Sequence, residues 1–121
     1  MKLEVGMYVR TKDDGIQKIT KVTENGCFYR TCTAGFEYKT SLSDKEDIVS
    51  EPSFEIMELI KIGDVFLDSY GRKKEVFGKE YNEEYQEWRL YYSLCWYLTK
   101  DKIKKVLTKE QFENSSFKVS D

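Results

Sequence analysis

Histidine is absent from the 121-residue sequence, and this removes a large part of enzyme chemistry. Without imidazole there is no Ser–His or Cys–His nucleophile, and no histidine can act as an acid, a base or a metal ligand. A structural zinc site needs four ligands, and the three cysteines Cys27, Cys32 and Cys95 include no C-x₂-C pair. We therefore expect no metal, no cofactor and no catalytic centre.

Long apolar runs are also missing. No stretch approaches the roughly 20 apolar residues that span a bilayer, and the first nine residues have no apolar signal region. An odd number of cysteines without such a signal favours reduced thiols, and we expect Cys95 to be packed among the aromatic residues around it. These features predict a soluble cytoplasmic protein that does not bind membranes.

Glycines and carboxylates give no catalytic pattern either. The seven glycines are scattered singly, so the sequence contains no glycine-rich phosphate loop. Acidic residues cluster at 13–14, 44–47 and 83–84, where we predict turns, so they are better interpreted as solvated than as a paired acid and base.

What is present is a series of strand signals. Asn25-Gly26 is the strongest hairpin signal, and residues 3–9 alternate as a strand does. Residues 86–99 alternate over a longer distance and predict one long strand, with an apolar stripe in the core. An amphipathic helix beginning within 81–88 is the alternative, so region 79–97 is either strand or partly helix. The stripe consists of Trp88, Leu90, Tyr92, Leu94, Trp96 and Leu98.

Two short helices are also predicted. Ser53 can cap a helix over 54–60, although an extended segment fits nearly as well. Thr108 and Gln111 have the spacing of a capping box, which predicts one helical turn. Further short strands are expected at 35–39 and 116–119.

An internal sequence repeat divides the chain into two β units, residues 1–57 and 58–121, which we expect to form one compact body. Gly6 in Val5-Gly6-Met7 corresponds to Gly63 in Ile62-Gly63-Asp64, and each glycine is followed by a turn and two hairpin strands. The fold predicted is mainly antiparallel β, either two small barrels in tandem or one barrel-like sheet, with one or two short helices.

Three segments carry a resemblance to known proteins: residues 5–16, residues 58–65, and the tail from Val106-Leu107-Thr108-Lys109-Glu110-Gln111-Phe112 to residue 119. They resemble small uncharacterised phage and prophage proteins of low-GC Gram-positive bacteria. The first segment also resembles the opening strand of SH3-like and KOW-like barrels. The resemblance implies a protein at work in a bacterial host cell, and it implies no activity.

Because catalytic groups are lacking, binding is the activity that remains. Arg89, Tyr91 and Tyr97 lie between the residues of the apolar stripe, and Tyr and Arg are enriched at interface hot spots. Glu83 and Glu84 belong to an acidic turn nearby that can mimic phosphate spacing. We expect an accessory protein that binds a host protein, such as a defence factor that it inhibits or a regulatory factor.

The alternative is a small β-barrel module that binds nucleic acid. Two basic clusters, with tyrosines between them as stacking platforms, support it. Lysines on an edge strand also serve simply to block aggregation, which is the plainer interpretation. The residues of the two clusters are Arg72, Lys73, Lys74, Lys102 and Lys104.

Overall fold

The computed structural model describes residues 2–31 and 41–115 and confirms a mainly β protein with antiparallel sheets and one short α-helix. Strands dominate because β-branched and aromatic residues fill the alternating segments. The elements in chain order are β1 (Tyr8–Thr11), β2 (Gly15–Val22), β3 (Gly26–Thr31), β4 (Ser41–Asp44), η1 (Lys45–Asp47), η2 (Ile56–Leu59), β5 (Val65–Asp68), β6 (Lys73–Glu75), β7 (Gly78–Asn82), β8 (Glu87–Tyr91), β9 (Tyr97–Thr99), η3 (Lys100–Lys102), β10 (Ile103–Leu107) and α1 (Lys109–Ser115).

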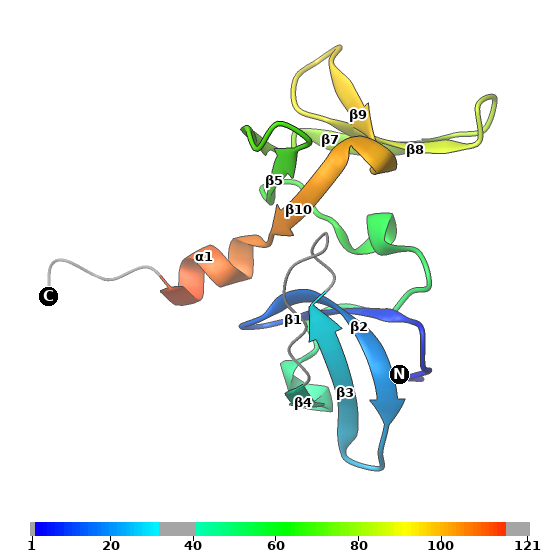
Figure 1. Ribbon diagram of the computed structural model, residues 1–121, viewed down its shortest axis with the longest axis vertical. Coiled ribbons are helices and arrows are strands. Elements are labelled where there is room, and N and C mark those ends of the chain that lie inside the picture. The colour runs from blue at the N-terminus through cyan, green and yellow to red at the C-terminus, as the bar shows by residue number, and fades with distance from the viewer. Residues whose placement is uncertain (1, 32–40, 116–121) are drawn as a thin grey trace, which may run out of the picture.

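The strands form three sheets, with orders β1-β2-β3-β4, β10-β5-β6 and β7-β8-β9. Figure 1 shows the first sheet at one end of the molecule and the β7–β9 sheet at the other, with β10 running between them. Within the described ranges the sheets stay open, so the small barrels expected from the sequence do not close. The hairpin predicted at Asn25-Gly26 is confirmed as the β2–β3 turn.

The sequence repeat at Gly6 and Gly63 is matched by a shared backbone conformation at the two glycines. Both glycines have positive φ, +94° and +98°, a conformation that residues with a Cβ rarely adopt. Gly6 N–H donates to the Ile19 carbonyl at 3.0 Å, and Gly63 N–H donates to the Val76 carbonyl at 3.1 Å. In the first part of the chain, the 3₁₀ turn η1 precedes Ile48, which pairs with Thr11 of β1. In the second part, the 3₁₀ turn η3 precedes Ile103, which pairs with Asp68 of β5. The division of the chain at residue 57 stays a prediction.

Two apolar clusters form the core. One lies within the β1–β4 sheet and contains Val9, Ile19 and Tyr29. The other joins both parts of the chain, since Ile16 of β2 and Met57 of η2 share it with residues of the later sheets. Those later residues are Phe66, Val76 and Leu90, with Trp88, Tyr92 and Leu98 packed against them.

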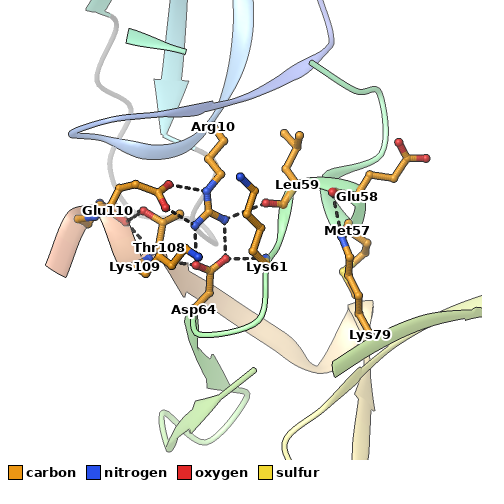
Figure 2. Close-up of polar contacts among 11 residues, drawn as sticks. Arg10, Met57, Glu58, Leu59, Lys61, Asp64, Lys79, Thr108, Lys109 and Glu110 are labelled. Carbon is orange, nitrogen blue, oxygen red and sulfur yellow. Dashed lines mark hydrogen bonds and ion pairs between the residues drawn. The ribbon is translucent and has the colours of Figure 1, made fainter. Parts of the chain in front are cut away.

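A buried ion cluster also connects the two parts (Figure 2). Arg10 of β1 is fully buried and donates two hydrogen bonds to the equally buried Asp64, at 2.5 and 2.6 Å. It donates two more to Glu110 of α1, and a fifth to the Leu59 carbonyl at 2.8 Å. All five guanidinium N–H groups therefore have an acceptor, as a buried charge requires. Burial alone lowers the pKa of Arg10, but Asp64 and Glu110 outweigh it and raise the pKa.

Both predicted helical segments form, but only the cap at Thr108 is the expected one, because η2 is capped by Glu55, whose side chain accepts from Met57 N–H, and not by Ser53. In the capping box, Gln111 N–H donates to the Thr108 hydroxyl at 3.4 Å, and Thr108 N–H donates to the Gln111 side chain at 3.0 Å. The segment after Ser53 is helical rather than extended, as the 3₁₀ turn η2, and the Ser53 hydroxyl accepts from Glu55 N–H. Lys79 of β7 donates to the Met57 and Glu58 carbonyls, which ties η2 to the β7–β9 sheet (Figure 2).

Some of the elements expected from the sequence were wrong, and others fall outside the described residues. The long strand over 86–99 is a hairpin, because the chain reverses between β8 and β9, and 81–88 is strand and turn rather than helix. The strand expected at 3–9 begins only at Tyr8, because Val5 and Gly6 form a turn that leaves Val5 exposed. The strands expected at 35–39 and 116–119 lie outside the described residues.

Candidate binding face

The β7–β9 sheet has an inner and an outer face. Leu90 and Leu98 are paired neighbours on β8 and β9 and point into the core. Alternation therefore places Arg89, Tyr91 and Tyr97 on the outer face, where the sequence analysis expected a contact surface. Tyr91 and Tyr97 are directly paired across the strands, with ring centroids 5.4 Å apart. The structure thus brings these three predicted residues together.

Arg89 is held between aromatic rings and carboxylates. Its guanidinium carbon lies 4.3 Å from the centroid of the Tyr97 ring and 5.4 Å from that of Tyr85, distances typical of cation–π contacts. Its Nε donates to Glu87 at 2.7 Å, and Glu80 lies 3.8 Å away. The hydrogen bond to Glu87 is the main reason why the pKa of Arg89 is raised. The arginine is therefore fixed and largely neutralised.

Tyr91 is fixed in the same way. Its hydroxyl donates to Glu80 at 2.8 Å, and this bond raises the pKa of Tyr91 because it favours the protonated phenol. Aromatic side chains have few rotatable bonds, so a surface of ordered tyrosines loses little conformational entropy when a partner binds.

The loop over 92–96, between β8 and β9, exposes large apolar side chains. Tyr92 N–H donates to the Trp96 carbonyl at 3.1 Å, and Trp96 N–H donates to the Ser93 hydroxyl at 3.2 Å. The tight reversal leaves Leu94 86% exposed and Trp96 65% exposed. Both were expected in the core, and that expectation was wrong because alternation between faces holds only while a strand continues. Cys95, expected to be packed, is exposed for the same reason.

We call Arg89, Tyr91, Leu94, Trp96 and Tyr97 the hairpin surface. Leu94 and Trp96 are exposed at the end of a hairpin whose outer face carries an ordered Tyr–Arg stack, and elsewhere the described residues also expose Tyr70, Ile62 and Phe54. The arrangement matches the composition of protein interface hot spots. The same loop exposes the thiol of Cys95, and the sequence contains no histidine that could activate it.

Acidic residues lie at the Arg89 end of the hairpin surface, at the opposite end of β8 from the loop over 92–96. Glu83 and Glu84 are exposed in the turn between β7 and β8, the turn that also contributes Tyr85 to the Arg89 stack. Lys79, the nearest lysine on β7, points inward to η2 and does not offset them at the surface. This end of the hairpin surface therefore has an acidic character that suits a basic partner.

The two basic clusters of the nucleic-acid hypothesis lie apart. In the β10-β5-β6 sheet, Lys73 and Lys74 are on β6 and Lys104 is on β10, at opposite edges. Lys102 lies in η3, just before β10. Lys74 stacks on the inward Tyr92 ring at 4.0 Å, and Arg72 is paired with Asp68 at 2.8 Å. These five residues do not form one continuous basic tract.

Sequence reasoning missed three members of this region: Tyr85, Leu94 and Trp96. Glu87 was expected in the acidic turn, and it is the first residue of β8. For the loop the only local signal is Ser93, because the segment contains no Gly, Pro or Asn to mark a reversal.

Among residues 2–31 and 41–115, no helix is long and apolar enough to cross a membrane, and no three potential ligands gather around a metal position. Comparisons with protein families, with curated proteins and with solved structures found no match. The functional argument therefore depends on the chain itself.

Proposed function

We propose that this chain is a non-enzymatic accessory protein of a phage or prophage that acts by binding a host protein through the hairpin surface. The observation that carries the proposal is the exposure of Leu94 and Trp96 beside an ordered stack of Tyr91, Tyr97 and Arg89. Folding gains nothing from holding two large apolar side chains in water, so a partner that covers them is the physical reason for their position.

The acidic residues beside the hairpin surface limit the kind of partner that fits it. Glu83 and Glu84 are exposed at the β7–β8 turn, and Arg89 is compensated by Glu87, so the Arg89 end of the hairpin surface attracts positive charge. A host protein with a basic surface beside an apolar pocket fits this description. A nucleic-acid-binding defence or regulatory factor is one such protein, and the acidic turn then occupies the place of phosphates.

The phage origin rests on sequence resemblance. Residues 5–16, 58–65 and 106–119 resemble small phage and prophage proteins of low-GC Gram-positive bacteria, in the right relative order. The place of action that follows is the cytoplasm of the bacterial host cell.

The proposal is tested by affinity capture from a lysate of a low-GC Gram-positive host. The bait is the full chain, compared with Trp96→Ala, with a Tyr91→Ala/Tyr97→Ala variant and with the control Tyr70→Ala. Tyr70 is a matched control because it is 82% exposed and lies outside the hairpin surface, in the turn after β5. We expect one host protein that the full chain and Tyr70→Ala enrich and the other two variants lose.

Equal enrichment by all four baits would contradict a role for the hairpin surface. The nucleic-acid alternative has its own signature, an electrophoretic shift that weakens steeply with salt because bound phosphates release counterions. A shift of that kind, abolished in a variant with Lys73, Lys74, Lys102 and Lys104 changed to Glu, would replace protein binding as the function.

A further inference from the structure

A cavity of about 210 Å³ lies between the two parts of the chain, away from the hairpin surface. β1, β2 and η2 form one side of it, and η3 and β10 form the other. Its floor is apolar, with Ile16, Met57, Ile60, Ile103 and Val106 among the lining residues. An apolar cavity that opens to the surface exposes carbon to water, which favours an occupant that buries it.

The size of the cavity limits the occupant. Small-molecule and cofactor sites usually enclose about 300–1,000 Å³, so 210 Å³ is small for a whole ligand. It suits one aliphatic or aromatic side chain, in the way that an interface anchor fills a pocket on its partner.

The rim of the cavity is basic. Lys100, Lys104 and Lys105 line it beside the apolar floor. Lys100 is paired with Glu55 at 2.8 Å, but the lysine side chain is 54% exposed, and exposed ion pairs of this kind are weak. Carboxylates on an incoming segment can therefore compete for this lysine. Charge complementarity favours an acidic occupant.

The backbone beside the cavity belongs to the outer strand of its sheet. β10 is the outer strand of the β10-β5-β6 sheet, and in the described parts of the chain no strand pairs along its other side. Such an edge can accept an extended peptide as an additional strand, with main-chain hydrogen bonds for affinity and alternate side chains for specificity. Lysines on the edge discourage neutral or basic strands and accept an acidic one.

We propose that the edge of β10 binds an extended acidic segment of a partner protein, which places one apolar side chain in the 210 Å³ cavity while its carboxylates meet Lys100, Lys104 and Lys105. The site is separate from the hairpin surface and does not depend on the function proposed above. It gives the protein a second docking point with the opposite charge preference.

The test is a titration of ¹⁵N-labelled protein followed by NMR. The probes are extended seven-residue peptides with acidic residues around a central Leu, Ile, Val, Met, Phe or Trp. Two control series carry Ser at the centre or Lys in place of the acidic residues. We expect at least one apolar-centred peptide to give saturable shifts at residues 103–106 and 56–60, at least tenfold stronger binding than its Ser control, and no such shifts from the Lys series.

A protein variant provides the second half of the test. Lys104→Glu/Lys105→Glu changes exposed side chains and should fold, and it should weaken binding of the best peptide at least tenfold. Its matched control is Lys73→Glu, an exposed lysine on the opposite edge of the same sheet, which should leave binding unchanged.

The proposal is overturned if no apolar-centred acidic peptide shifts residues 103–106, or if the Ser-centred peptides bind equally well. It is also overturned if the shifts appear at Tyr91 and Tyr97 instead. The peptide comparison decides the question even if the double variant fails to fold.

Discussion

Replacing Arg10 with Met should destabilise the protein by about 3–5 kcal/mol, the usual cost of breaking a buried ion pair by removing one partner. Asp64 is fully buried, and without the guanidinium it keeps only two backbone donors, Lys61 N–H at 2.8 Å and Lys109 N–H at 3.0 Å. The Leu59 carbonyl loses its donor as well. Glu110 suffers less, because its side chain is 17% exposed and can reach water.

The assay is urea unfolding followed by tryptophan fluorescence and circular dichroism. With a urea dependence of about 1–3 kcal/mol per molar, the loss moves the midpoint by roughly 1–5 M. Arg10→Lys should fall between wild type and Arg10→Met, since an ammonium keeps the charge but cannot reproduce the five-donor fork. In a double-mutant cycle with Asp64→Asn, the double variant should be more stable than the sum of the single losses by about 0.5–3 kcal/mol. A loss below about 1 kcal/mol for Arg10→Met, with additive effects, would refute the role given to this cluster.

Three smaller predictions follow from local contacts. The Arg10 hydrogen bonds lower the pKa of Glu110 in the folded state. The contribution of Glu110 to folding stability is therefore complete above the ordinary glutamate pKa of about 4.5 and is lost as the pH falls through the lowered pKa. Glu110→Gln should make the midpoint temperature of unfolding depend less on pH between pH 3 and 5 than it does in the wild type. Parallel pH dependences for the variant and the wild type would contradict this. Thr108→Ala should cost about 0.5–2 kcal/mol in urea unfolding through loss of the capping box, and no measurable change would argue against the cap. In a Cys32→Ser background, maleimide should modify native Cys95 rapidly and spare Cys27, which is buried and whose pKa burial raises; labelling of both at equal rates would contradict this.

Local signals in the sequence predicted much of the fold. Asn25-Gly26 marks the hairpin, and Gly26 is needed there because a Cβ would lie 1.9 Å from the Ser43 carbonyl oxygen. Thr108 and Gln111 form the predicted cap because both partners lie within four residues. The repeat at Gly6 and Gly63 could be recognised in the sequence because both positions have positive φ, which favours glycine. In each case the signal is a short run of neighbouring residues.

Long-range structure was less accessible. Arg10 meets Asp64 and Glu110, 54 and 100 residues away, and each is an ordinary charged residue in its own segment. The candidate site was half predicted. Arg89, Tyr91 and Tyr97 share a face as alternation requires, but the reversal at 92–96 has no glycine or proline to mark it, so the exposure of Trp96 was not foreseen.

The central claim is that the hairpin surface binds a host protein, and titration calorimetry with the captured protein tests it most directly. Trp96→Ala, Tyr91→Ala and Tyr97→Ala should each weaken binding by about 1–3 kcal/mol, roughly 5–150-fold in Kd, without changing the urea midpoint by a comparable amount. Tyr70→Ala should bind as wild type does, and affinity should fall with salt less steeply than for a protein that binds phosphates. Unchanged affinity in all three variants, or a loss equal to that of Tyr70→Ala, would contradict the account.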